Sequence, residues 1–170
     1  LGSGELRFKK PILTYWFVLA GFELFGVSPF SSRLLFLLAG AATIGFVFWA
    51  AKIFFKDIRV ANLAALIMAS HPVLILSSTR SIPDVLLGMF MALSTVGFVA
   101  FLKYGNDTPR KYSWVLYLGL AFAFEVKGLP AAAIGGLGLV YLLFNPWQRV
   151  RLKNLVYLLL KMSIALNWTS

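Results

Sequence analysis

Two long apolar runs that meet around an arginine and an acid constrain this chain more than any other feature. Residues 60–79 and 85–102 form runs of 20 and 18 residues without a formal charge, and Arg80 and Asp84 lie between them. A helix rises about 1.5 Å per residue, so each run can cross a hydrocarbon core of roughly 30 Å. We therefore expect an integral membrane protein. Because charged groups are costly to place near hydrocarbon, Arg80 and Asp84 are candidates for a functional site.

The composition excludes a soluble enzyme. Hydrophobic residues make up 60% of the chain, aromatic residues 16%, and the mean hydropathy is +0.84, which is more apolar surface than a soluble domain can bury. The net charge of +10 does not indicate a nucleic-acid partner, because the basic residues fall in the short gaps between apolar runs, where they report membrane orientation. Cysteine is absent, which excludes disulfides and thiolate metal sites.

The apolar runs predict an all-α membrane protein, a polytopic helical bundle with about five to six membrane helices and one short interfacial helix. The interfacial helix is expected at 11–26, because it is short for a span and Glu23 interrupts it. Residues 113–144 are too long for one crossing, and Gly128 and Pro130 predict a break there. The expected spans, within one transmembrane domain over 1–170, are 31–54, 59–79, 83–103, 113–127, 130–144 and 153–168.

The charges between the spans predict an orientation. By the positive-inside rule, the side of the membrane that carries most of the lysine and arginine is cytoplasmic. When the spans alternate, Arg80 and Lys127 fall on one side, and nine basic residues fall on the other. Those nine are Lys52, Lys56, Arg59, Lys103, Arg110, Lys111, Arg149, Arg151 and Lys153. The charges expected toward the outer face are Lys9, Lys10, Arg80, Asp84, Glu125 and Lys127.

Charged groups on the depleted side can form a site for an anionic head group at the outer leaflet, because charge-assisted hydrogen bonds to phosphate are strong where water is scarce. Simpler interpretations stay open. Asp84 follows Pro83 and can be stabilised by the dipole at a helix N-terminus. Lys127 can stabilise a helix C-terminus or extend its amine to the interface. Arg80 and Asp84, four residues apart, can form an ordinary ion pair.

The remaining candidates carry less weight. Lys9 and Lys10 can be lipid-facing basic residues. Glu125 and Lys127 are two residues apart and so lie on different helix faces, which does not favour a pair. His71 precedes Pro72 inside an expected span, and we interpret it as a polar side chain that fills a loosened helix. Metal ligation by His71 is disfavoured, because the sequence holds no second histidine and no cysteine.

Several short motifs, taken in order, resemble one family of membrane enzymes. They are Phe8-Lys9-Lys10-Pro11-Ile12-Leu13-Thr14-Tyr15-Trp16, Phe25-Gly26-Val27-Ser28, Ser32-Arg33, Arg80 with Pro83-Asp84, and Val126-Lys127-Gly128. Their order and spacing are similar to those of the polyprenyl-phosphate-sugar glycosyltransferases with the GT-C membrane fold. The likeness is to the branch that contains the lipid A aminoarabinose transferases and the dolichyl-phosphate-mannose protein mannosyltransferases, and it covers most of the chain.

The resemblance implies roles for individual residues. Lys10, in the Lys-Pro pair, corresponds to a ligand of the donor phosphate, and Lys127, in the Lys-Gly pair, to a second one. Arg80 is the next candidate for the phosphate. Asp84 corresponds to an orienting acid that opens a span beside the lipid-phosphate cavity. Lys9 stands where the family has an acid that takes part in metal binding, so no metal or other cofactor is expected.

The resemblance also implies a reaction. Such enzymes transfer a sugar from a polyprenyl-phosphate carrier to a lipid, glycan or protein acceptor outside the cytoplasm, here at a bacterial inner membrane. The family's acidic loop, with the general base, is expected upstream of Leu1, so the chain is interpreted as a piece of a longer polypeptide that is inactive alone. The alternative is a transporter or a non-catalytic assembly subunit that binds lipid-linked sugars. An acidic pair in that upstream loop would favour the enzyme.

Overall fold

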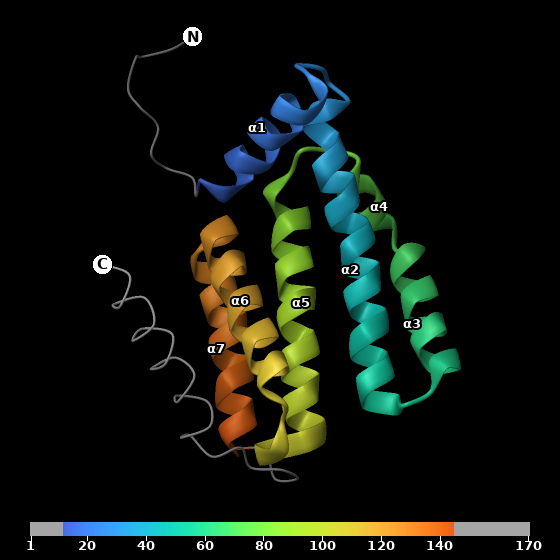
Figure 1. Cartoon of the computed structure of the whole chain (residues 1–170), viewed down its shortest axis with the longest axis vertical. Coiled ribbons are helices and arrows are strands. Elements are labelled where there is room, and N and C mark those ends of the chain that lie inside the picture. The colour runs from blue at the N-terminus through green and yellow to red at the C-terminus, as the bar shows by residue number, and fades with distance from the viewer. Residues whose placement is uncertain (1–11, 145–170) are drawn as a thin grey trace.

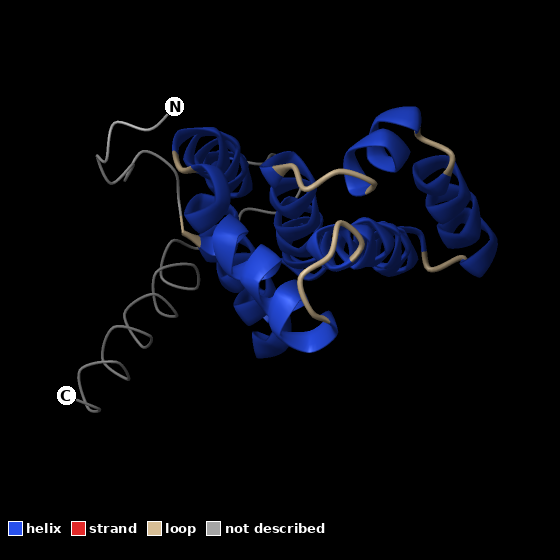
Figure 2. Cartoon of the chain, turned by 90° about the horizontal axis from the view of Figure 1, so that it is seen from above, coloured by secondary structure: helices blue, strands red, loops and turns tan. Residues whose placement is uncertain are grey.

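The computed structural model describes residues 12–144, and these residues form helices and loops without any strand (Figure 1, Figure 2). The all-α membrane fold expected from the sequence is confirmed. The elements are α1 (Leu13–Phe25), α2 (Ser31–Phe55), α3 (Ile58–Ala69), α4 (Pro72–Ser78), α5 (Pro83–Tyr104), the 3-10 turn η1 (Gly105–Asp107), α6 (Arg110–Lys127) and α7 (Leu129–Phe144).

The long helices run up and down beside one another, with α5 between α2 on one side and the hairpin of α6 and α7 on the other (Figure 1). Helix α1 crosses one end of this bundle, and α3 and α4 lie against the outer side of α2. Two hydrogen bonds join the ends of α2 to distant segments. Ser81 Oγ donates to the Ser32 carbonyl at 2.8 Å at one end, and Lys103 Nζ donates to the Phe54 carbonyl at 2.8 Å at the other.

Helices α2 and α5 occupy the segments expected as spans at 31–54 and 83–103, and both are long and apolar enough to cross a membrane. The helices expected at 113–127 and 130–144 form as α6 and α7, and α1 occupies the segment expected as the interfacial helix. Among residues 12–144, two helices are long and apolar enough to cross a membrane, or three if the bent pair α3 and α4 counts as one span. Five to six membrane helices therefore stays a prediction, and the span expected at 153–168 lies outside the described residues.

The segment expected as one span at 59–79 is not a single straight helix. The structure divides it into α3 and α4, which are bent by 60°. Pro72 lacks the N–H that would continue the helical ladder, and His71 before it is extended, with φ −71° and ψ 116°. The His71 side chain is exposed and does not fill the break.

The break between α6 and α7 was expected and is confirmed. Gly128 has a positive φ of 56°, and its N–H donates to the Phe124 carbonyl at 2.7 Å, which ends α6. Helix α7 then begins at Leu129, one residue earlier than the proline suggested, because Pro130 is tolerated within a first helical turn. The outcome is a hairpin that returns the chain toward the start of α6.

In the part of the chain that the structure describes, the core divides into three clusters of buried side chains. The largest one lies under α1 and joins α2, α5, α6 and the start of α7. Its buried members are Phe36, Ala39, Val85, Leu86, Phe90, Ala123, Val126 and Ala131. From α1, Phe17 adds edge-to-face ring contacts with Phe36 and Phe90, at centroid distances of 6.5 Å and 6.4 Å. This cluster fixes the end of the bundle where the candidate site residues lie.

Candidate functional site

Asp84 and Lys127 meet at the end of the bundle that α1 covers. Asp84 belongs to the first turn of α5 and Lys127 to the last turn of α6. The Lys127 amine Nζ donates a hydrogen bond to Asp84 Oδ1 and forms an ion pair with it. Because α5 and α6 are antiparallel neighbours, the start of one helix and the end of the other come together. The structure thus joins two residues that the sequence analysis considered separately.

The local sequence explains why each group stands at a helix end. Pro83 is the first residue of α5, where its fixed φ suits the helix and its missing N–H leaves no bond unmade. Asp84 therefore lies at the positive end of the helix dipole, where an anion is stabilised. Gly128 ends α6 directly after Lys127, so the cation lies at the negative end of a dipole. The simpler interpretations of both residues are compatible with this placement and stay open.

The ion pair is open to the surroundings. The side chains of Lys127 and Asp84 are 46% and 55% exposed. Exposed pairs of this kind stabilise a fold by about 0.2–1 kcal/mol, because solvent screens the charges and two mobile side chains must be ordered. An anionic ligand can therefore replace Asp84 as the partner of Lys127 at a small cost in stability.

Rigid packing holds the backbone beneath this pair. Val85 follows Asp84 in sequence, Val126 precedes Lys127, and each is 2% exposed within the largest core cluster. The backbone of both charged residues is thus anchored by close-packed neighbours in the core, and it moves only if that packing changes. An amine and a carboxylate, each on a fixed helix end, are therefore accessible to a ligand at this end of the bundle.

Arg80 does not pair with Asp84. Asp84 forms its ion pair with Lys127 instead, so the alternative of an Arg80–Asp84 pair is wrong. The physical reason is that α5 begins only at Pro83, so Arg80 and Asp84 do not share a helix face. Arg80 is exposed and belongs to the connection between α4 and α5, next to the hydrogen bond from Ser81 to Ser32.

The other predicted site residues divide by position. Lys9 and Lys10 lie outside the described residues, so their proximity to Lys127 stays a prediction. Glu125 is exposed on α6 and forms no ion pair within the described part of the chain. That part also contains no group of three histidine, cysteine or acidic side chains that could hold a metal ion. The described residues do not fit a metal site, and no step below uses one.

The sequence contained a signal for the pair of Asp84 and Lys127, although rules for spacing within one helix do not detect it. Both Asp84 and Lys127 were expected toward the same face, and the spans that carry them follow one another through a short loop. Adjacent antiparallel helices bring such ends together. Rules that compare residues three or four apart cannot find a contact across 43 positions.

Comparison with known proteins decides the family. Residues 9–170 match the family described as dolichyl-phosphate-mannose-protein mannosyltransferase. The chain belongs to this family. The resemblance inferred from the motifs around Lys10, Asp84 and Lys127 is therefore confirmed, although the match assigns no role to any of these residues.

Similar curated proteins carry a related name. The chain is 28% identical over 155 residues to the undecaprenyl phosphate-alpha-4-amino-4-deoxy-L-arabinose arabinosyl transferase of Yersinia enterocolitica, covering 90% of this chain and 27% of that protein. It is 29% identical over 155 residues to the protein of the same name from Serratia proteamaculans, covering 90% and 27%. The chain thus spans less than a third of the length of these relatives. No solved structure matches it significantly.

Proposed function

We propose that this mannosyltransferase-family chain is part of an integral membrane glycosyltransferase of the cell envelope. The enzyme takes a sugar from a polyprenyl-phosphate carrier and transfers it to an acceptor on the outer side of the membrane. Membership of the family and the names of the similar arabinosyl transferases support the reaction class. The observation that carries the proposal to this chain is the exposed ion pair between Lys127 and Asp84, which places an accessible cation where α6 ends beside the start of α5.

The reaction is a displacement at the anomeric carbon. An acceptor oxygen forms a bond to that carbon while the bond from the carbon to the phosphate oxygen breaks. The departing polyprenyl phosphate keeps the electron pair, and the acceptor proton goes to a carboxylate base. One such displacement inverts the anomeric centre. The base belongs to the family's acidic loop, which we expect upstream of Leu1.

Lys127 acts on the leaving group in this proposal. Negative charge grows on the phosphate as the bond breaks, and a positioned ammonium group stabilises that charge more in the transition state than in the bound donor. Donor binding draws Lys127 away from Asp84, and the freed carboxylate then orients the amine or an acceptor hydroxyl. Lys10 and Arg80 are proposed as further phosphate ligands. Their charges would share the same leaving group.

The outer location rests on the distribution of charge. Within residues 12–144, six basic residues cluster where α2 and α5 end and α3 and α6 begin, namely Lys52, Lys56, Arg59, Lys103, Arg110 and Lys111. The end that carries Asp84 and Lys127 has three basic residues and three acidic ones. By the positive-inside rule we place the first end in the cytoplasm and the second outside it.

Sugar transfer by the full-length protein tests the proposal. With a labelled polyprenyl-phosphate sugar at saturating concentration, we expect Lys127→Ala to lower the transfer rate about 10²- to 10³-fold, as the loss of one donor to a developing oxyanion does. Lys10→Ala should behave similarly. Lys111→Ala, at the basic end, is the matched control and should transfer normally. Normal transfer by Lys127→Ala, or donor binding without any turnover by the unmodified protein, would contradict the proposal.

A further inference from the structure

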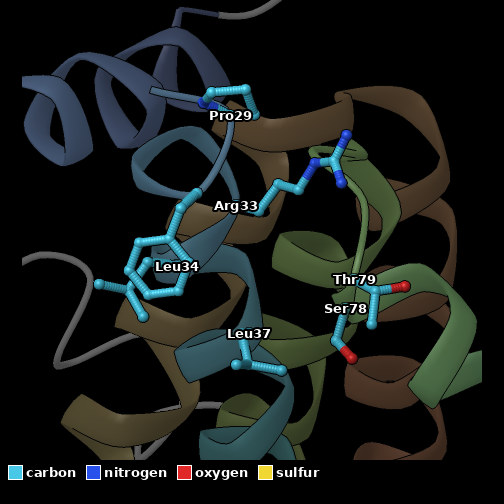
Figure 3. A pocket seen from close by; sticks show the side chains of 7 residues that line it. Pro29, Arg33, Leu34, Leu37, Ser78 and Thr79 are labelled. Atoms are coloured by element: carbon cyan, nitrogen blue, oxygen red, sulfur yellow. The ribbon is translucent and has the colours of Figure 1, made fainter. Parts of the chain in front are cut away.

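A second feature at the same end of the bundle is a groove of about 370 Å³ between α2 and α4. Its lining consists of Pro29, Phe30, Arg33, Leu34, Leu37, Ser78 and Thr79. Figure 3 shows the Arg33 side chain extending from α2 toward the connection after α4, with Ser78 and Thr79 on the opposite wall and Leu37 deeper along α2. Neither Asp84 nor Lys127 lines this groove.

The walls of the groove are largely apolar and open. Phe30 is 65% exposed and Leu37 is 48% exposed. Phe30 directly precedes α2 and Leu37 belongs to it, and α2 is a candidate membrane span. The other wall is formed at the end of α4, the second helix of the bent pair. Because α2 is long and apolar enough to cross a membrane, a groove along its surface is expected to face lipid. Its apolar part suits an acyl chain, which loses no hydrogen bonds on entry.

Arg33 provides a cation at the mouth of the groove. Its side chain is exposed, and within the described part of the chain it forms no ion pair. It stands in the first turn of α2, which contains no acidic residue. A cation is disfavoured at this positive end of a helix dipole, so a bound anion would complement both the guanidinium and the dipole. A phosphate group fits best, since its oxygens match the planar donor fork of arginine.

The hydroxyl groups of Ser78 and Thr79 on the other wall favour a particular kind of lipid head group. Ser78 Oγ donates to the Ile75 carbonyl at 3.0 Å, and Thr79 Oγ1 donates to the Leu76 carbonyl at 3.0 Å. Their protons are thus used within α4, and their oxygens can only accept a further hydrogen bond. A head group that presents hydroxyl donors next to its phosphate satisfies this wall and Arg33 together.

We propose that the groove binds one anionic phospholipid of the surrounding membrane, with phosphatidylglycerol as the best fit. Its phosphate contacts Arg33, its glycerol hydroxyls donate to Ser78 and Thr79, and one acyl chain lies over Phe30, Leu34 and Leu37. The lipid fills the space between α2 and the bent pair and holds α4 in place. This site is independent of sugar transfer, so either proposal can fail without the other.

Native mass spectrometry of the full-length protein in detergent, titrated with phosphatidylglycerol, tests the site. Losing a hydrogen bond to a charged group weakens binding about 10- to 100-fold, which is the effect expected for Arg33→Ala on the tightest bound lipid. Arg33→Lys should fall between wild type and Arg33→Ala, because lysine keeps the charge but not the fork. Leu37→Trp keeps the charge and fills the groove, and it should weaken binding as well.

The controls separate this site from general attraction to lipid. Arg59→Ala removes an exposed arginine at the basic end and should bind phosphatidylglycerol like wild type. Phosphatidylcholine carries the phosphate but no glycerol hydroxyls, so it should bind to wild type more weakly than phosphatidylglycerol does. Unchanged binding by Arg33→Ala would exclude the phosphate contact, and unchanged binding by Leu37→Trp would exclude the groove. An Arg33-dependent preference for undecaprenyl phosphate over phosphatidylglycerol would show that the carrier lipid is the occupant and would overturn the proposal.

Discussion

Asp84 and Lys127 owe their positions to three separate effects. Each lies at the end of a helix whose dipole favours its charge, each neighbours a buried valine, and the two attract one another. The mutual attraction contributes little to stability, because both side chains are about half exposed. The surroundings of the pair nevertheless hold it in place. A ligand can therefore replace Asp84 as the partner of Lys127 without disturbing the fold.

The proposed role of Asp84 differs from a purely structural one in what its removal changes. We expect Asp84→Asn to lower the transfer rate of the full-length protein about 10²-fold, because misplaced catalytic groups cost about that much. Thermal unfolding should show a loss of stability below about 1 kcal/mol, as for other exposed pairs. Asp107→Asn, beyond the far end of α5, is the matched control. Equal transfer by both variants would reduce Asp84 to a helix-capping charge.

At the level of the helices, close approach of α5 and α6 sets the geometry that the ion pair completes. A Cβ at Gly119 of α6 would lie 2.6 Å from the Ser94 amide nitrogen of α5, and a Cβ at Gly97 of α5 would lie 2.5 Å from the Tyr112 carbonyl oxygen. Each helix thus has a glycine where the other backbone touches it. Small residues permit this contact between membrane helices, where van der Waals packing drives association.

The close packing of α5 against α6 can be tested by adding a methyl group at the contact. Gly119→Ala should destabilise the protein by about 1–3 kcal/mol, because the added methyl group meets backbone that cannot move aside. Gly88 lies within α5, the partner helix. Its replacement by alanine meets nothing within 4 Å and should leave stability unchanged or raise it by up to about 1 kcal/mol. Thermal unfolding of the two variants in the same detergent measures the difference. Equal melting temperatures would show that α5 and α6 do not touch in this way.

Over the whole molecule, the bundle separates charge between its two ends. The basic end contains Lys52, Lys56, Arg59, Lys103, Arg110 and Lys111, with Asp57 and Asp107 as its acids. Among residues 12–144, the other end contains equal numbers of basic and acidic residues. By the positive-inside rule we expect the basic end in the cytoplasm, and this orientation would place the ion pair and the groove at the outer leaflet.

Cysteine labelling in intact cells tests this orientation, and the chain has no cysteine of its own to interfere. We expect a membrane-impermeant thiol reagent to label Ser81→Cys and to leave Lys56→Cys and Asn106→Cys unlabelled. After the cells are opened, the reagent should label all three. Labelling of Asn106→Cys but not Ser81→Cys in intact cells would reverse the topology and place the ion pair in the cytoplasm.

Much of this fold follows from local sequence. Long apolar runs predict α2 and α5, because a helix that satisfies its own backbone is the stable form in lipid. Gly128 with Pro130 predicts the break between α6 and α7 for steric reasons within a few residues. Pro72 also lies in the sequence, but proline in a membrane helix either kinks or ends it. Packing of α4 against α2 and α5 accompanies the 60° bend that divides the expected span.

The sequence by itself determined the helices, their order and the sides on which their charges fall, since these depend on hydrophobicity and on residues close together in the chain. Only the tertiary structure decided that Lys127 rather than Arg80 is the partner of Asp84. It also decided that Arg33 borders a groove with Ser78 and Thr79. Such contacts join residues more than 40 positions apart, and they depend on how closely helices approach and how they are rotated, which side-chain packing across the whole bundle sets.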